Sequence, residues 1–276
     1  MVLENLSQMA QAVEDNWCDA WASLAGVQAL PQTQVDETPQ YLRVYTPGIP
    51  EMLLNMMIRY RSEGPVEREA LERIIEPYRQ HHLPFQWWLT LGAEPAGLRD
   101  QLRRLGLQTW GGATAMALSL NGWQPHYRPP IAGAFFRRIA SAAEARSALD
   151  VICQVFFVPS APMARWTTEN DAFDVYVAHW DGRVVAALAT LRKGHVVGVY
   201  HVATVAGARR RGIAGNLLIM ALREAQAAGC TLATLTATSE ARHLYERLGF
   251  RSCGTIEQWA PGPQLSRALY YGDGAL

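Results

Sequence analysis

The chain has 276 residues, enough for two domains of about 140 residues each, and 49% of its residues are hydrophobic. Its 25 basic and 25 acidic side chains give a net charge of zero, so overall charge favours neither nucleic acid nor an anionic membrane as a partner. No apolar run reaches the ~18 residues of a membrane span, and the N-terminus lacks the basic residues that begin an export signal. We therefore expect a globular cytoplasmic protein with no membrane anchor.

Neither the cysteines nor the histidines are spaced like metal ligands. The four cysteines are scattered without CxxC spacing: Cys18, Cys153, Cys230 and Cys253. They predict reduced, packed thiols. The adjacent pair His81-His82 is too closely spaced to bind a metal, and no third ligand accompanies it, so we predict no metal site.

The first half of the chain predicts alternating helices and strands. Apolar residues at helical spacing predict a helix within residues 3–30, which we expect to pack against the first domain. Further elements are predicted in this order: a strand at 41–45, helices at 51–60 and 66–80, a strand at 83–91, a helix at 95–105 and a strand at 116–120.

A linker divides the chain near its middle. Residues 121–133 (NGWQPHYRPPIAG) contain three prolines and two glycines, which is linker composition. We place one domain at 1–122, the linker at 123–133 and a second domain at 134–276. The second domain begins with a strand at 135–139, a helix at 141–157 with Ser141 as N-cap, an irregular loop at 158–171 and a hairpin of strands at 174–180 and 183–192.

The stretch from 196 to 228 has the pattern of a phosphate-binding unit. Residues 196–205 are apolar throughout and predict a buried strand, and a helix begins near Ile213. The motif Arg209-x-x-Gly212-x-Ala214 lies between them, where free amide groups at a helix N-terminus can hold a pyrophosphate. By itself the loop is equally compatible with a solvated helix start.

The residues that follow carry a family resemblance. Residues 230–237 predict a strand and 239–248 a short helix that ends at Gly249. The arginine-glycine loop, followed by Ala241-x-x-Leu244-Tyr245-Glu246-Arg247-Leu248-Gly249-Phe250, resembles the Gcn5-related N-acetyltransferase (GNAT) superfamily. The resemblance begins near Phe135 and implies an α/β fold with a mixed sheet.

A weaker internal similarity relates the two halves. Residues 102–111 align with 245–254, each after an apolar strand and a short helix, so we interpret the chain as two copies of one fold, although short matches between helix ends also arise by chance. Leu102 takes the place of Tyr245, and 61–69 (RSEGPVERE) lacks the arginine-glycine motif, so the first copy should have lost its cofactor site. The arrangement resembles tandem GNAT proteins with a degenerate N-terminal domain.

By this resemblance the protein is an acetyl-CoA-dependent N-acetyltransferase in which a primary amine attacks the thioester directly. Backbone amides from Arg210 to Gly215 would hold the pyrophosphate of coenzyme A, with charge from the arginines, and the strand would pair with the pantetheine arm. The implied cofactor-binding residues are Val202, Ala203, Thr204, Arg209, Arg210, Arg211, Gly212, Ile213, Ala214, Gly215 and Thr238. Thr238 stands where the family often has asparagine, which puts that cofactor contact in doubt.

Tyr245 is the residue that the resemblance assigns as general acid. A phenol with a pKa near ~10 stays protonated at neutral pH and can protonate the departing thiolate. Its apolar neighbours also fit a tyrosine that only packs in the core.

The general base is left open by the sequence. His201 on the central strand, and Glu169 or Asp171 in the loop at 158–171, are candidates, as is a chain of water molecules. His201 also fits a core histidine, and the carboxylates also fit solvated loop charges.

By the resemblance we expect the acceptor to be a small-molecule or peptide amine, and a small amine, an amino acid and a peptide N-terminus all remain open. Trp166, Phe173 and Tyr176 suggest a partly aromatic acceptor pocket, although aromatic residues at strand spacing are common in cores. We expect the groove between the domains to receive the acceptor. The alternatives are a transferase for a longer acyl-CoA and a non-catalytic CoA-binding or interaction module. The oligomeric state is not indicated.

Overall fold

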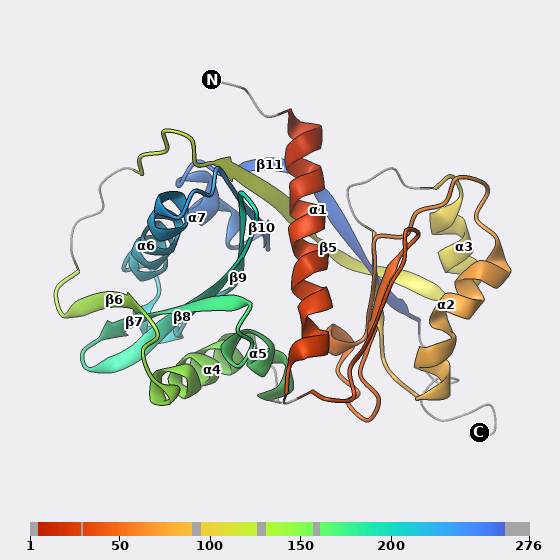
Figure 1. Ribbon diagram of the computed structural model, residues 1–276, viewed down its shortest axis with the longest axis horizontal. Coiled ribbons are helices and arrows are strands. Elements are labelled where there is room, and N and C mark those ends of the chain that lie inside the picture. The colour runs from red at the N-terminus through yellow and green to blue at the C-terminus, as the bar shows by residue number, and fades with distance from the viewer. Residues whose placement is uncertain (1–4, 29, 90–94, 126–130, 157–160, 263–276) are drawn as a thin grey trace. The chain divides into compact units, whose positions relative to one another are not determined.

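The computed structural model describes residues 5–28, 30–89, 95–125, 131–156 and 161–262 (Figure 1). Contacts divide the chain into unit 1, Met1–Ala29 with Thr114–Cys253, and unit 2, Leu30–Ala113 with Gly254–Leu276. The two units therefore interleave along the chain. The division at 123–133 stays a prediction, and residues 126–130 of that linker lie outside the described residues.

Unit 1 is built on a mixed sheet whose strands run in the order β5-β10-β9-β8-β7-β6. Their bounds are β5 Leu107–Ser119, β6 Ala134–Arg138, β7 Phe173–Trp180, β8 Arg183–Lys193, β9 Val196–Thr204 and β10 Leu232–Ala237. β9 and β10 are parallel, whereas the pairs β10–β5, β9–β8, β8–β7 and β7–β6 are antiparallel. The predicted mixed α/β class is confirmed.

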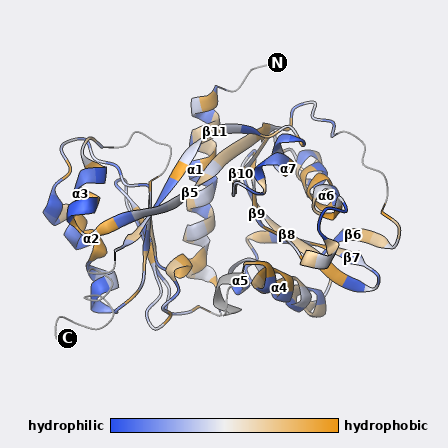
Figure 2. Ribbon diagram, turned by 180° about the vertical axis from the view of Figure 1, so that it is seen from behind, coloured by the Kyte–Doolittle hydropathy of each residue, from blue (hydrophilic) through white to orange (hydrophobic). Residues whose placement is uncertain are grey.

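Helices of unit 1 pack against this sheet. They are α1 Leu6–Ala22, continued by the 3-10 turn η1 Ser23–Gly26, α4 Ala142–Phe156, α5 Ala161–Thr168, α6 Ile213–Ala227 and α7 Arg242–Glu246. Apolar residues of α6, such as Leu217 and Leu222, form one core with Val197 and Val199 of β9. In Figure 2 the hydrophobic and hydrophilic residues of α6 alternate around the helix, as expected for one buried and one solvated face.

The strands of unit 2 run in the order β1-β2-β3-β4-β11. Its strands are β1 Gln34–Glu37, β2 Leu42–Tyr45, β3 Met56–Ile58, β4 Gln86–Leu89 and β11 Arg251–Pro261, and its helices are α2 Arg68–Gln80 and α3 Leu98–Arg104. β5 and β11 each cross a unit boundary, at residues 113–114 and 253–254. Each unit thus uses a strand that begins in the other.

Most predicted elements of the second half are confirmed. The hairpin turns at Asp181 and Gly182, whose φ angles of 50° and 76° match the twist of a two-residue turn. The hydroxyl of Ser141 accepts a bond from the Glu144 amide at 3.2 Å, so it caps α4 as expected.

Three predictions about the elements are wrong. The helix expected at 51–60 is instead the 3-10 turn η2 (Met52–Leu54) followed by β3, because the buried Asn55 side chain bonds the Thr46 amide and the Ile49 carbonyl and so prevents a helix. The loop expected at 158–171 contains α5, since Pro162 stands in the first turn, where a helix tolerates proline. The first helix, expected to pack against the first domain, packs on β8, β9 and β10 of unit 1.

The structure contains no helix among its described residues that is long and apolar enough to cross a membrane. None of the four cysteines, all of which lie in the described part of the chain, forms a disulfide, and Cys18 and Cys230 are buried.

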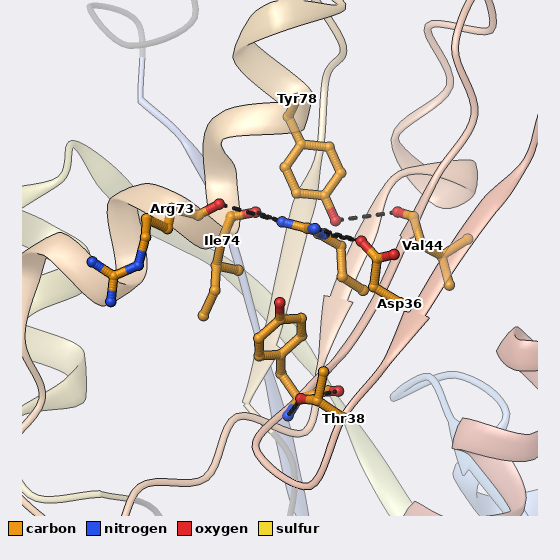
Figure 3. A network of polar contacts seen from close by, with 8 residues as sticks. Asp36, Thr38, Val44, Arg73, Ile74 and Tyr78 are labelled. Carbon is orange, nitrogen blue, oxygen red and sulfur yellow. Dashed lines mark hydrogen bonds and ion pairs between the residues drawn. The ribbon is translucent and has the colours of Figure 1, made fainter.

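Pro77 inside α2 is accommodated by an arginine from β2. Proline has no N–H, so the carbonyl of Arg73, four residues earlier, loses its helical donor. Arg43 replaces it: its Nη1 donates to the carbonyls of Arg73 at 3.3 Å and Ile74 at 2.8 Å (Figure 3). The same guanidinium is ion-paired to Asp36. Arg43 therefore ties α2 to the sheet of unit 2.

Replacing Arg43 by alanine is expected to lower the free energy of unfolding by about 2–4 kcal/mol, because it leaves two carbonyls and a carboxylate without their partner. The control is Arg68→Ala: its side chain is 57% exposed and forms an ion pair with Glu72 within α2. That variant should lose at most about 0.5 kcal/mol. Urea denaturation measures both, and equal losses would contradict this role of Arg43.

Candidate active site

The N-terminus of α6 presents amide groups that no side chain covers. Gly212 is the N-cap residue, with φ of 83°, and no described side chain caps the helix. The Gly212 carbonyl accepts the Asn216 amide at 3.0 Å, as in a regular first turn. The amides of Ile213, Ala214 and Gly215 precede that bond and have no partner within the helix. With the positive end of the helix dipole, such amides are suited to hold an anion.

The loop that leads into α6 has an unusual backbone. Arg210 adopts φ of 61°, in the left-handed region that non-glycine residues seldom occupy, and Gly212 follows two residues later in the same region. Such strain is retained where the surrounding structure fixes it, and it is found often at ligand-binding loops.

Two of the three arginines in this loop also hold it in place. Arg209 donates from Nε to the Thr204 carbonyl at 3.0 Å, which joins the loop to the end of β9. The guanidinium of Arg211 lies over the Trp180 ring, 4.5 Å from its centroid. All three arginines are exposed. Their charge is therefore kept close to the start of α6.

β9 loses its partner strand on one side before it reaches this loop. It pairs with β10 through three residue pairs, the last being Thr234 with Gly198. On its other side β9 stays paired with β8 as far as Thr204. Among the described strands, none pairs with the β10 side of β9 beyond Gly198, so this edge can accept the amide groups of an extended ligand.

The register of β8 and β9 shows which backbone groups face that edge. The Val205 amide bonds the Val185 carbonyl at 2.9 Å, and Ala203 pairs with Ala187 two residues earlier. Because hydrogen-bonded and non-bonded pairs alternate, the backbone groups of Ala203 face β8, whereas those of Val202 and Thr204 face the open edge. The Thr204 carbonyl at this edge already accepts a hydrogen bond from Arg209. The buried hydroxyl oxygen of the Thr204 side chain, Oγ1, has no partner among the described residues.

These features fit coenzyme A. Uncovered helix amides and nearby arginines suit its diphosphate, and an open strand edge suits the amides of its pantetheine arm. No group of three or more His, Cys, Asp or Glu that could hold a metal occurs in the described part of the chain.

Tyr245 lies in α7 and is buried, with 5% of its surface exposed. It belongs to the core of unit 1, and its ring meets Phe250 edge-on at 5.9 Å. Burial raises the pKa of Tyr245 well above its usual range, so the phenol is protonated at neutral pH. No described residue is hydrogen-bonded to its hydroxyl.

Thr238 lies in the turn before α7, whose N-cap residue is Ala241. Its hydroxyl accepts the Ala241 amide at 3.4 Å, and its carbonyl accepts the amides of Ala241 and Arg242, each at 3.1 Å. The residue is exposed. The structure thus gives Thr238 a local structural role in the turn after β10.

His201 lies in a bulge of β9. Between the pairs Ala187–Ala203 and Ala189–Tyr200, β9 has one residue more than β8, and His201 takes φ of 50° there. Its Nδ1 is 3.0 Å from the Thr167 hydroxyl of α5. The rings of Phe156 and Trp166 lie 5.8 and 5.6 Å from its ring. Burial among them lowers the pKa of His201 to about 4, so the imidazole is neutral at pH 7.

The other candidate bases face solvent. Glu169 is exposed and forms an ion pair with Arg165 at 3.2 Å, one turn earlier in α5. Asp171 is also exposed. His201 is the candidate that shares a strand with Val202 and Thr204.

The aromatic residues expected to line an acceptor pocket are core residues. Trp166, Phe173 and Tyr176 are 1%, 6% and 3% exposed. Tyr176 packs in the α6 core and donates to Glu224 at 2.9 Å, whereas Trp166 and Phe173 meet edge-on at 5.4 Å. The alternative given by the sequence, that these aromatic residues pack in the core, is therefore correct for all three.

Sequence reasoning missed Thr167, the partner of His201. It stands in the stretch taken for a loop, and one threonine among polar residues gives no periodic signal. Recognition of α5 would have placed Trp166 and Thr167 on a helix beside the site, with Pro162 as the sign of its first turn.

The depressed pKa of His201 predicts how stability depends on pH. The unfolded chain binds a proton at this residue near pH 6.5, whereas the folded chain does not until about pH 4. Stability should therefore fall as the pH drops from 6.5 to 4, by up to about 3 kcal/mol. Thermal unfolding of wild type and His201→Asn across this range tests it. Equal slopes in the two proteins would show that His201 does not cause the loss.

Comparison with known proteins gives three findings. Residues 171–252 match a family model described as "Acetyltransferase (GNAT) domain". No curated protein matches the chain. Solved structures resemble it over most of its length.

A GCN5-related N-acetyltransferase from Kribbella flavida is 21% identical with a TM-score of 0.65, covering 90% of this chain and 97% of its own. One from Sphaerobacter thermophilus is 16% identical with a TM-score of 0.58, covering 84% of each chain. A tandem GNAT protein from the clavulanic acid biosynthesis pathway is 14% identical with a TM-score of 0.59, covering 92% and 96%. At these identities the likeness establishes a shared fold.

Proposed function

We propose that this chain, which belongs to the GNAT superfamily through its domain at residues 171–252, transfers an acetyl group from acetyl-CoA to a primary amine. The observation that carries the proposal is the uncapped start of α6 directly after the open edge of β9. The two together offer an anion site and an amide-pairing edge within one short segment.

In the proposed reaction the chain must bind the diphosphate, align the pantetheine arm and stabilise the oxyanion. The amine nitrogen attacks the thioester carbonyl, the carbon–sulfur bond breaks with its electrons on sulfur, and the sulfur takes up a proton. The amides of Arg210 to Gly215 would bind the diphosphate, and those of Val202 and Thr204 would align the pantetheine arm. A backbone N–H at the open edge of β9 would stabilise the oxyanion.

Tyr245 is proposed as the general acid. Its hydroxyl keeps its proton at neutral pH and has no described protein partner, so it can give that proton to the departing thiolate. A raised pKa makes it a weak acid, and the reaction therefore depends on a site that also disfavours a free thiolate.

His201 is proposed as the group that receives the proton of the attacking amine. In the neutral tautomer whose Nδ1 carries the hydrogen and donates it to the Thr167 hydroxyl, Nε2 has a lone pair that can accept this proton. Glu169 is a second candidate, and it would have to leave Arg165 to act.

The acceptor is proposed to be a small molecule or a peptide with a primary amine. Thiol release from acetyl-CoA over a panel of amines, beside thermal shift with CoA, tests the function. Turnover with at least one amine and a shift with CoA support the transferase. A shift without turnover on any amine would favour the non-catalytic CoA-binding module, and tighter binding of longer acyl chains would favour a different donor.

A further inference from the structure

α1, the first helix, reaches the strand that carries His201. Asn16 of α1 is 2% exposed, and its Oδ1 accepts the Tyr200 hydroxyl at 2.6 Å. Its Nδ2 donates to the Leu191 carbonyl at 3.3 Å. Gly198 makes this approach possible, because a Cβ there would lie 1.8 Å from Asn16 Oδ1. α1 is therefore bonded to both β8 and β9.

The end of α1 is bonded to α5. The rings of Trp21 and Trp166 stack with centroids 4.3 Å apart and an angle of 26° between their planes. The indole N–H of Trp166 donates to the Ala20 carbonyl at 3.1 Å and to Ser23 Oγ at 3.2 Å. Asn170, just after α5, donates to the Ser23 carbonyl at 3.2 Å. These contacts fix α5 against α1.

α5 in turn orients His201. Thr167 bonds its Nδ1, and the neighbouring Trp166 meets its ring edge-on. The imidazole is therefore held on two sides by consecutive residues of one helix. Both residues, and all of α1, lie outside the segment 171–252 that matches the family model.

We infer that Trp166 is a positioning residue for His201, acting together with Thr167, and that α1 is its support through Trp21 and Ser23. The inference rests on the proposed function, in which His201 receives the proton of the acceptor amine. The chain's first helix would then influence how the acceptor amine is positioned for attack.

The variants remove this support in small steps. Trp21→Phe reduces the stack on Trp166 and costs no hydrogen bond to a described residue, since the buried Trp21 Nε1 has none. Ser23→Ala removes the hydroxyl that Trp166 and Asn170 share. Trp17→Phe is the matched control: Trp17 is 6% exposed in the same helix, and its ring contacts Trp21 at 6.2 Å.

Two measurements on the full chain separate this inference from the proposed function. Nitrogen NMR of the imidazole side chains reports the tautomer and titration of His201 without any turnover. Steady-state kinetics with the best amine of the panel, and CoA titration, report the acceptor and cofactor sites.

Trp21→Phe and Ser23→Ala are expected to shift the His201 nitrogens and lower kcat/KM for the amine about tenfold, with the Kd of CoA within twofold. Trp17→Phe should change none of these. Thr167→Val should alter the His201 tautomer, and Thr167→Ser should restore it. Unchanged nitrogen shifts in both support variants would overturn the inference even if the wild type shows no turnover. Shifted nitrogens with unchanged kcat/KM would overturn its link to the acceptor.

Discussion

Gly212→Glu is expected to raise the Kd of CoA at least 100-fold. The new carboxylate would lie among the amides that start α6, where the diphosphate is proposed to bind. Two like charges about 5 Å apart at an effective dielectric constant of about 20 repel by roughly 3 kcal/mol, which alone exceeds a 100-fold loss. Isothermal titration of CoA into the variant measures the effect.

The control for this variant stands at the other end of the same helix. Gly229 follows α6 with φ of 93°, so Gly229→Glu adds the same charge and a comparable backbone strain. It should lose similar stability and bind CoA like the wild type. If Gly212→Glu leaves CoA affinity unchanged, the proposed cofactor site and the transferase assignment both fail.

Tyr245→Phe should lower kcat about 100-fold while leaving the Kd of CoA within twofold. General acids contribute factors of about 10²–10⁴, and phenylalanine has no proton to give. The fold should persist, because the lost hydroxyl has no hydrogen-bond partner among the described residues. Single-turnover kinetics with acetyl-CoA and a productive amine isolate the chemical step.

A second buried tyrosine provides the comparison for Tyr245. Tyr176 belongs to the same core and donates its hydroxyl to Glu224 at 2.9 Å. Tyr176→Phe should lose about 1 kcal/mol of stability and keep its kcat. Should the two variants show the same kcat, Tyr245 acts only in packing.

Local patterns predicted the segments around the cofactor loop. The buried strand β9, the loop and α6 follow from an apolar run, two glycines and helical periodicity, all within about 30 residues. Gly249 marks the end of the helix with Tyr245, and its φ of 99° confirms the reason for glycine there.

Elsewhere the local patterns gave wrong or incomplete predictions. Asn55 uses its amide to bond backbone groups that a helix would need, which no apolar pattern reveals. β5 was foreseen only at 116–120, because Gly111 and Gly112 interrupt its alternation. Gly112 is required there, since a Cβ would lie 2.7 Å from the Ile256 carbonyl oxygen.

Contacts between residues far apart in the chain could not be predicted from the sequence. The bonds from Asn16 to Tyr200 and from Trp166 to Ala20 join residues 184 and 146 positions apart. An amphipathic helix has an apolar face whatever surface it covers, so its pattern could not identify its partner. The contact between Thr167 and His201, which are 34 positions apart, could likewise be recognised only in the structure.

The contacts of α1 also affect the order in which the chain can fold during translation. The ribosome releases α1 before its partner β9, which starts 174 residues after Ala22. At about 5–20 residues per second, roughly 9–35 s pass before that surface exists. Throughout this interval the face of α1 that packs on β9 lacks its partner, so the nascent helix offers an apolar surface that a ribosome-associated chaperone can bind.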